Sequence, residues 1–118
     1  MSTEHNKIPF QRVVQMWQYG DLEKVEELTT ADYVGHVSQG DRDRDGLKAR
    51  IQAFRSIYPD VVFTIHDQMT DGDKVISRLS ARGTHSETGK LTDLIGINIS
   101  RVVDGKVAEE WATWEVKL

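Results

Sequence analysis

The sequence contains no cysteine, only two prolines and no long run of apolar residues. Without cysteine the chain can have no disulfide framework, no thiol chemistry and no cysteine-ligated zinc. No apolar stretch approaches the roughly 20 residues that a membrane-spanning helix requires. The first ten residues, MSTEHNKIPF, lack the basic and apolar regions of a secretion signal. We therefore expect a cytoplasmic protein that does not enter a membrane.

An excess of positive charge is also missing. The net charge is −4, and acidic and basic residues are interspersed along the 118 residues. A nucleic-acid or anionic membrane partner would require a basic surface, so we expect neither. The length is typical of one domain, and no repeat, linker or low-complexity tract divides the chain. We therefore predict a single domain over residues 1–118.

Histidines with the spacing of metal ligands are absent too. The four histidines, His5, His36, His66 and His85, form no HxxH or HxxxH pattern. No paired carboxylates accompany them, whereas a protein metal site needs several such ligands close together. We therefore expect no metal.

The N-terminal half has the periodicity of helices. Apolar residues at i, i+3, i+4 and i+7 predict a helix over about residues 9–19. A second helix is predicted over residues 22–28, with Asp21 as its N-cap. A short extended piece then ends at His36, and residues 40–44 form a solvated loop. Asp45 is expected to cap a third helix, which Pro59 ends.

From Val61 onward the apolar period changes from 3.6 to 2, which indicates strands. Turn signals at residues 71–73 and 103–106 separate them. The order is three helices followed by four strands. It predicts an α+β fold with the helices packed on one side of an antiparallel sheet.

The last two predicted strands, residues 91–116, form a hairpin with two different faces. Ile95, Ile97 and Ile99 alternate with smaller or polar residues. The sequence allows two registers for the pairing of these strands across the turn. A three-residue loop places Asn98 opposite Glu110, whereas a two-residue loop moves every pair by one position.

Four short motifs recur together in one family of proteins. They are Tyr33-Val34-Gly35-His36, Gly72-Asp73-Lys74-Val75, Arg82-Gly83-Thr84-His85, and residues 101–107 leading into Glu109-Glu110-Trp111. In this order and spacing they resemble the SnoaL-like polyketide cyclase group of the nuclear transport factor 2-like superfamily. The resemblance implies a cone-shaped fold, with three N-terminal helices on a curved antiparallel sheet. It also implies a small hydrophobic ligand or substrate and no cofactor.

The resemblance assigns family positions to residues of the hairpin. It places pocket residues at Asn98, Ala112 and Trp114, which favours the three-residue loop. The cyclases' general acid/base aspartate corresponds to Ala112, and the histidine that assists it corresponds to Asn98. Alanine cannot transfer a proton, and asparagine can only donate or accept hydrogen bonds. The aspartates and arginine of related epoxide hydrolases correspond to Leu79, Ala81 and Ala112.

Three residues are candidates for catalysis: His36, Asn98 and Glu110. His36 lies near the place of the general base in related ketosteroid isomerases, and imidazole titrates near neutral pH. The alternative for His36 is a hydrogen bond to loop backbone. Asn98 could donate to an oxyanion. Glu110 faces the expected pocket, where burial would raise its pKa; otherwise it is solvated or ion-paired.

Most of the candidate substrate-binding residues are aromatic. They are Trp17, Tyr33, Phe54, Tyr58, His85 and Trp114. Two or three such rings suffice to hold a planar ligand, although packing alone would also explain them.

The isoleucine face of the hairpin would be the outer side of the sheet. An apolar outer face needs a cover, so we expect a homodimer through it. Three functions remain open from the sequence. They are a cofactor-free cyclase or isomerase, a ligand-binding or accessory domain that has lost its acid/base group, and an interaction domain that works through its outer sheet.

Overall fold

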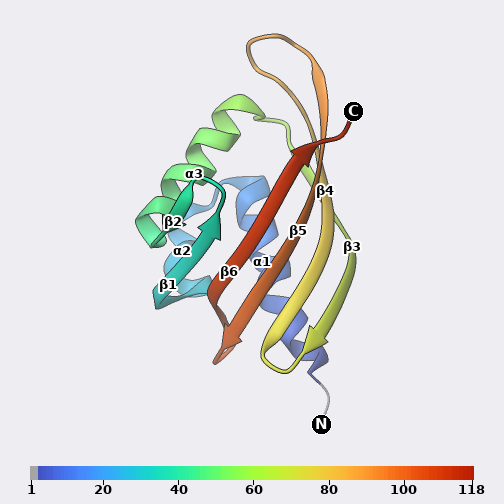
Figure 1. Cartoon of the computed structure of the whole chain (residues 1–118). Coiled ribbons are helices and arrows are strands. Elements are labelled where there is room, and N and C mark those ends of the chain that lie inside the picture. The colour runs from blue at the N-terminus through green and yellow to red at the C-terminus, as the bar shows by residue number, and fades with distance from the viewer. Residues whose placement is uncertain (1–2) are drawn as a thin grey trace.

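The computed structural model describes residues 3–118 as three α-helices on a six-stranded sheet (Figure 1). The α-helices are α1 (Lys7–Tyr19), α2 (Val25–Leu28) and α3 (Arg44–Ile57), and short 3-10 turns, η1 (Glu4–Asn6) and η2 (Leu22–Lys24), precede α1 and α2. None of the helices within residues 3–118 is long and apolar enough to span a membrane.

The strands form one sheet in the order β2-β1-β6-β5-β4-β3. Their bounds are β1 (Thr29–Val37), β2 (Gly40–Arg42), β3 (Val62–Asp71), β4 (Lys74–Thr84), β5 (Leu91–Val103) and β6 (Lys106–Val116). All neighbouring strands are antiparallel except β1 and β6, which run parallel. The α+β class predicted from the sequence is confirmed.

The sheet has two more strands than the sequence suggested. The short extended piece that was expected to end at His36 is the nine-residue strand β1, and the expected loop after it contains β2. Only part of β1 alternates: Tyr33 and Gly35 are buried, whereas Ala31 and Asp32 are both exposed. Because the alternation is interrupted and the strand contains Gly35, apolar periodicity alone does not identify β1 as a long strand.

Two helix starts differ from the sequence expectation. Residues 22–28 are a 3-10 turn followed by a single α-helical turn, and the Asp21 side chain makes no capping hydrogen bond. The N-cap of α3 is Asp43 rather than Asp45, because Asp43 Oδ1 accepts a 2.9 Å hydrogen bond from the Gly46 backbone N–H. Asp45 lies inside the first turn, where its charge still favours the helix dipole.

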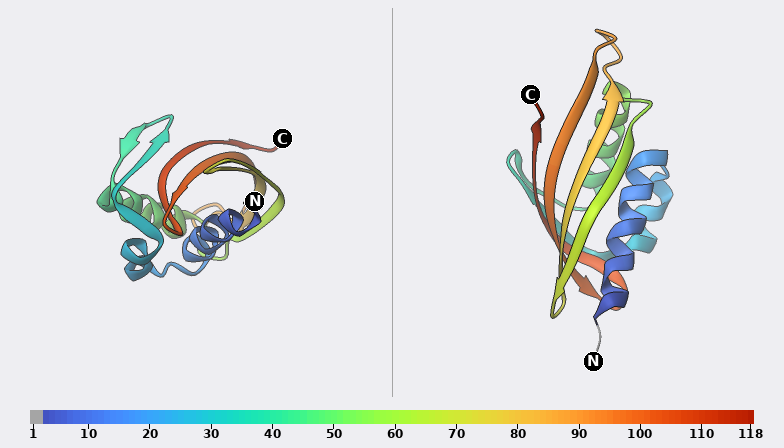
Figure 2. Two further views of the ribbon diagram at one scale, coloured as in Figure 1. Left: turned by 90° about the horizontal axis from the view of Figure 1, so that it is seen from below. Right: turned by 90° about the vertical axis from the view of Figure 1, so that its right-hand side faces the viewer.

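The curved sheet wraps around the helices, and the core lies between them (Figure 2). Its buried side chains come from α1, α2, α3 and the inner face of the sheet; they are Phe10, Val13, Val14, Met16, Val25, Leu28, Tyr33, Leu47, Ile51, Leu79 and Val107. The sheet is bent but does not close, so the helices and sheet together form a half-open cone.

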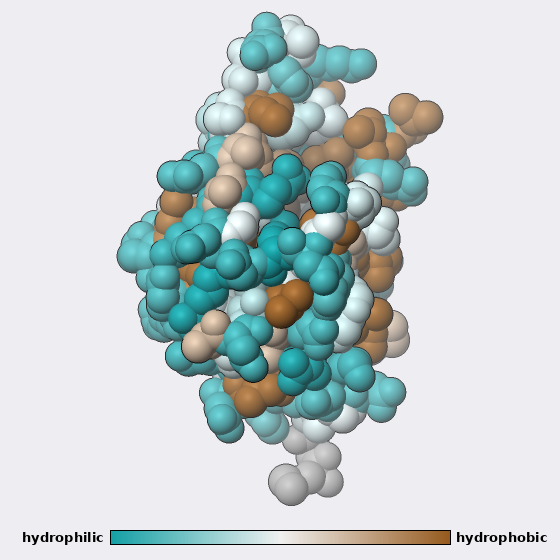
Figure 3. All heavy atoms as spheres, turned by 60° about the vertical axis from the view of Figure 1, so that its left-hand side comes forward, coloured by the Kyte–Doolittle hydropathy of each residue, from teal (hydrophilic) through white to brown (hydrophobic). Residues whose placement is uncertain are grey.

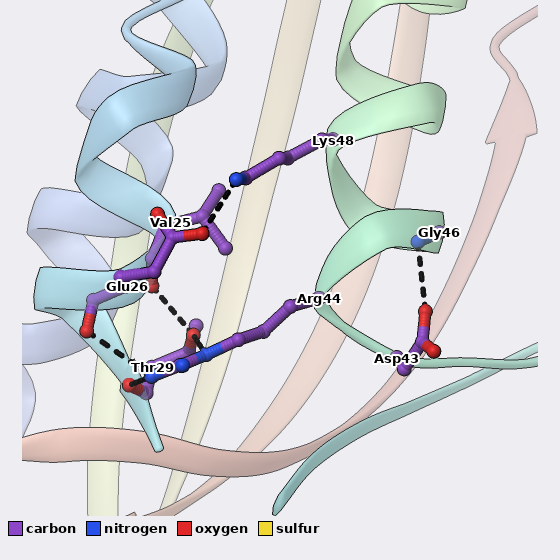
Figure 4. A network of polar contacts seen from close by, with 7 residues as sticks. All are labelled: Val25, Glu26, Thr29, Asp43, Arg44, Gly46 and Lys48. Atoms are coloured by element: carbon purple, nitrogen blue, oxygen red, sulfur yellow. Dashed lines mark hydrogen bonds and ion pairs between the residues drawn. The ribbon is translucent and has the colours of Figure 1, made fainter. Parts of the chain in front are cut away.

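A polar network joins α2, β1 and the start of α3 (Figure 4). Arg44 donates from Nη2 to the carbonyls of Thr29 and Glu26, at 2.5 and 3.1 Å, and from Nε to Thr29 Oγ1 at 3.1 Å. Lys48 on the next turn of α3 pairs with Glu26. Arg44 thereby satisfies carbonyls that the short helix α2 leaves without partners.

The observed register of the β5–β6 hairpin differs from both registers considered from the sequence, the two-residue loop and the three-residue loop. Val103 pairs with Lys106, so Asp104 and Gly105 form a two-residue loop with positive φ angles of 52° and 77°. A register shift between Arg101 and Val102 then changes the pairing by one residue. That bulge restores the face assignment expected for the longer loop.

Asn98 therefore lies opposite Ala112, and Gly96 lies opposite Trp114. The expected pairs of Asn98 with Glu110 and of Gly96 with Ala112 were wrong by two positions, because the bulge was not recognised. Glu110 instead faces Ser100. A shift of two leaves each residue on its expected face, since strand side chains alternate with period two.

Candidate functional site

A cavity of about 250 Å³ lies inside the cone. Its walls come from α1, α3, the β1–β2 turn and the inner face of β3 to β6. Ser38, Gln39, Arg50 and Trp114 line the cavity and are also exposed to solvent, so they mark its open side. The volume is just below the ~300–1,000 Å³ that is usual for small-molecule sites.

A chain of hydrogen bonds orients the polar groups on the sheet side of the cavity. Ser100 Oγ donates to Asn98 Oδ1 at 2.7 Å, and Asn98 Nδ2 donates to Glu110 Oε2 at 3.1 Å. The chain fixes which end of the Asn98 amide carries the donors. Asn98 Nδ2 carries a second N–H for which no protein acceptor is recorded. Asn98 and Glu110 are only 4% and 3% exposed, yet both line the cavity.

Burial raises the pKa of Glu110 above its ordinary value. The Arg42 charge, the hydrogen bond from Asn98 and the nearby hydroxyl of Tyr33 oppose this rise, but desolvation is the largest effect. Burial likewise raises the pKa of Tyr33, helped by the nearby charge of Glu110, so the phenol keeps its proton. A carboxyl whose pKa moves toward neutrality can both take and return a proton.

Tyr33 and Arg42 approach Glu110 from β1 and β2. Glu110 Oε1, Tyr33 Oη and Arg42 Nε are all buried, and none makes a hydrogen bond of good geometry with a described protein atom. Gly35 makes room for them: a Cβ there would lie 2.8 Å from Tyr33 Oη and 2.9 Å from Arg42 Nε. Three buried polar atoms with spare bonding capacity therefore lie beside the cavity, which is uncommon in a core that serves packing alone.

Aromatic rings form the apolar wall of the cavity. Trp17 and Phe54 meet edge to face with ring centroids 5.8 Å apart, and Phe63 and Trp114 do so at 6.1 Å. All four rings line the cavity. Such a wall suits the faces and edges of a planar apolar ligand.

Trp114 depends on Gly96 for its position. A Cβ at Gly96 would lie 2.5 Å from Cδ2 of Trp114, so the indole lies directly on the glycine backbone of β5. Only glycine leaves this surface free, which explains its presence in the middle of a strand.

The structure places His36 on the outer face of the sheet, and His36 does not line the cavity. Its Nε2 and Nδ1 contact Glu109 Oε2 at 2.6 Å and Asp41 Oδ1 at 2.8 Å, and its ring stacks on Trp111. Hydrogen bonds to Glu109 and then to Asp41 raise the pKa of His36. An imidazole that donates to two carboxylates is cationic and is poorly suited to act as a base.

Three of the expected ligand-binding residues lie beside the cavity rather than in its lining. Tyr33 is buried behind Glu110, as described above. Tyr58 and His85 lie beyond Phe54 at the end of α3, where their rings meet edge to face with centroids 5.7 Å apart. The cavity lining brings together five of the nine expected site residues: Asn98, Glu110, Trp17, Phe54 and Trp114.

Sequence reasoning missed Arg42, Arg50 and Phe63, which also line the cavity. Phe63 alternates with exposed residues on β3, so its inward face was predictable although its place in the lining was not. Arg42 lay in what was read as a solvated loop, and no pattern distinguishes Arg50 from other charged residues on a helix.

A wide groove of about 1110 Å³ lies on the opposite, outer face of the sheet. Ile95 and Ile97 line it and are 39% and 42% exposed, so the isoleucine face is the outer face, as expected. Arg78 and Arg82 lie there too, paired with Asp67 and Asp93. Within residues 3–118, no group of three or more histidine, aspartate or glutamate side chains is arranged to hold a metal ion.

The helices in a half-open cone and the cavity inside it define a nuclear transport factor 2-like protein. A family model described as SnoaL-like polyketide cyclase matches residues 8–116. The chain therefore belongs to the SnoaL-like polyketide cyclase family. A comparison with curated proteins found no match.

Solved structures agree with this assignment. Wild-type IdmH of Streptomyces antibioticus, described as a candidate polyketide cyclase, is 30% identical over 93% of this chain and 91% of its own, with a TM-score of 0.85. A protein of Bacillus cereus ATCC 10987 with the same description is 32% identical over 98% of this chain and 79% of its own, with a TM-score of 0.87. Family and neighbours support a cyclase- or isomerase-like protein that binds small molecules.

Proposed function

We propose that this protein catalyses cofactor-free proton transfer on a hydrophobic carbonyl compound held in the cavity. The reaction would be an aldol-type cyclisation or an isomerisation. The observation that carries the proposal is a buried carboxyl group, Glu110, which faces a cavity and is bonded to an oriented amide, Asn98.

Glu110 has the role of acid and base in this scheme. Its carboxylate removes a proton from the carbon beside the substrate carbonyl and becomes a neutral carboxylic acid. The second N–H of Asn98 donates to the enolate oxygen that forms. In an isomerisation the acid returns the proton to another carbon of the enolate. In a cyclisation the enolate carbon forms a bond to a second carbonyl carbon, and the proton passes to the new alkoxide.

The surroundings of Glu110 suit this role. Desolvation raises the pKa of the carboxyl group, so the carboxylate is a stronger base than it would be in water. The rings of Trp17, Phe54, Phe63 and Trp114 provide an apolar surface for the substrate. His36 takes no part, because two carboxylates hold it outside the cavity.

One observation favours a second function, ligand binding without catalysis. Ala112 lines the cavity directly opposite Asn98 on the neighbouring strand. This is the position that the family resemblance assigns to the acid/base aspartate, and alanine has no proton to transfer. If Glu110 does not replace that aspartate, the cavity binds a carbonyl compound and leaves it unchanged.

Deuterium exchange separates the two functions. The test compound is 2-tetralone, a bicyclic ketone with acidic protons beside its carbonyl, and exchange in D₂O is followed by NMR. The proposal predicts that the protein accelerates exchange at least about 100-fold over buffer, and that Glu110→Gln removes the acceleration. Glu115→Gln, on the same strand but exposed on the outer face, is the matched control and should retain it. Binding of 2-tetralone without faster exchange would favour the non-catalytic function.

We also propose that two copies associate through the outer face of the sheet. Ile95, Ile97 and Val62 line the groove there and are 39%, 42% and 54% exposed. Apolar side chains grouped on a sheet face are costly to leave in water, and a two-fold interface would cover them.

A further inference from the structure

Two arginines line the cavity, the exposed Arg50 at its open side and the partly buried Arg42 between that side and Glu110. Arg42 ends β2, Arg50 projects from α3, and both line the cavity. Glu110 is the one acidic side chain in the described lining. The lining therefore has a net positive charge of at least one, although the whole chain has a net charge of −4.

These two arginines differ from Arg44, Arg55 and Arg101 in that no oxygen atom of the described chain accepts a hydrogen bond of good geometry from their guanidinium groups. Within residues 3–118, neither Arg42 nor Arg50 forms an ion pair, and no hydrogen bond is recorded for Arg50. By contrast, Arg44, Arg55 and Arg101 are each bonded to backbone or side-chain oxygens.

Arg42 is held in place although its charge is not paired. Its guanidinium carbon lies 5.7 Å from the centre of the Trp17 ring, and Nε is buried without a hydrogen-bond acceptor. Glu110 lies near enough to feel the charge of Arg42 but does not form an ion pair with it. The guanidinium of Arg42 also carries terminal N–H groups, and no acidic side chain of residues 3–118 pairs with them, so they can donate to a ligand in the cavity.

We propose that the natural ligand carries a carboxylate, which Arg42 and Arg50 bind at the open side of the cavity. Its carbonyl end then reaches Asn98 and Glu110. This assignment rests on the proposed function, because it names the class of compound that the same cavity accepts.

The charges inside the cavity allow one orientation. A guanidinium group can bind a carboxylate through two parallel hydrogen bonds, and a carboxylate at the open side keeps part of its hydration. The reverse orientation would place the carboxylate against Glu110 and away from Arg50, so the two acids would repel each other and one of the two cations would be lost. The face that carries α3 and the β1–β2 turn is mostly hydrophilic, in keeping with a polar entrance (Figure 3).

Calorimetric titration with two matched probes tests the assignment. 2-Naphthoate carries the carboxylate, and 2-naphthamide has nearly the same shape without the charge. We expect naphthoate to bind at least about tenfold more tightly than naphthamide. Arg50→Gln and Arg42→Gln should each reduce this preference to about threefold or less, while naphthamide affinity stays nearly constant.

Arg12→Gln is the control for net charge. Arg12 is exposed on α1 and does not line the cavity, so this variant should retain the full preference. Because Arg42 is partly buried and its variant could be unstable, the exposed Arg50 provides an independent test. Equal affinities of wild-type protein for the two probes, or an unchanged preference in Arg50→Gln, would overturn the assignment and leave the proposed function standing. If neither 2-naphthoate nor 2-naphthamide binds, both the carboxylate assignment and the proposed function are contradicted.

Discussion

At the scale of single residues, the inner face of the β5–β6 hairpin carries the proposed chemistry. Strand alternation left open whether Asn98 and Glu110 share a face, and the family resemblance favoured the register that puts them on one face. Nothing in the sequence indicated the hydrogen bond between them, and the two residues are diagonal rather than opposite neighbours. Arg42 and Arg50 could not be predicted, because their role depends on how β2 and α3 pack against the sheet.

Gly96→Ala tests whether Trp114 needs the bare backbone beneath it. The added methyl group would overlap the indole and displace it, so we expect a loss of about 1–3 kcal/mol in the free energy of unfolding. Binding of 2-naphthoate should weaken as well. Chemical denaturation and calorimetry measure the two effects.

A double-mutant cycle provides the control. In a Trp114→Ala background the new methyl group has no ring to displace, so Gly96→Ala should cost little there. An equal cost in both backgrounds would mean that the strand itself, not the indole, requires glycine.

At the scale of elements, local hydrogen bonds decided several boundaries that the sequence left uncertain. Asp43 and Asp45 both precede apolar helical positions, and either is a reasonable N-cap by residue type. The structure selects Asp43 because the chain leaving β2 directs that side chain toward the N–H of Gly46. The bulge between Arg101 and Val102 has no comparable sequence signal, so the hairpin register could not be derived.

Asp43→Ala should destabilise the protein through the start of α3. Loss of the capping bond is expected to lower the free energy of unfolding by about 1 kcal/mol, measured by urea denaturation. Asp45→Ala is the matched control and should cost only about 0.3 kcal/mol, because it removes a favourable charge but no hydrogen bond. A larger loss for Asp45→Ala would show that the cap is assigned to the wrong aspartate.

His36 joins β1 to β6 in a manner that depends on pH. Glu109 and Asp41 raise its pKa in the folded state above the ordinary value of 6.5. The protonated imidazole therefore stabilises the fold fully below about pH 6.5, and this contribution is lost as the pH rises through the higher folded-state pKa.

We expect His36→Asn to lower the melting temperature most at pH 5–6, with a difference from wild type that shrinks at alkaline pH. His66→Asn is the control, since His66 is exposed and its recorded side-chain partner is the neutral Ser80. A His36→Asn difference that stays constant or grows with pH would contradict the paired, protonated state.

At the scale of the whole molecule, the fold class was accessible from the sequence because the change of apolar period from 3.6 to 2 is sharp. The four motifs then narrowed the class to one family. The parallel pairing of β1 with β6 was not accessible, because it joins segments about 75 residues apart through backbone groups alone. The cavity itself depends on that pairing, since β1 brings Tyr33 and the β1–β2 turn to its edge.

Ile97→Glu tests association through the outer face. If two copies pack there, a charge at Ile97 should shift the protein from dimer to monomer in light scattering coupled to size-exclusion chromatography. Ile8→Glu is the control, because Ile8 is 47% exposed on α1, away from the outer face of the sheet. A wild-type protein that is monomeric at high concentration would contradict the proposed dimer.

The central claim is that Glu110 is a buried acid/base group in a small-molecule cavity. Its most direct test is a ¹³C NMR titration of the glutamate carboxyl carbons, with Glu110 assigned by comparison with Glu110→Gln. We predict a pKa clearly above the ordinary value of 4.5. We also predict that the Glu110 resonance shifts when 2-tetralone is added. A Glu110 that titrates at or below 4.5, with a resonance unaffected by the ketone, would contradict the account.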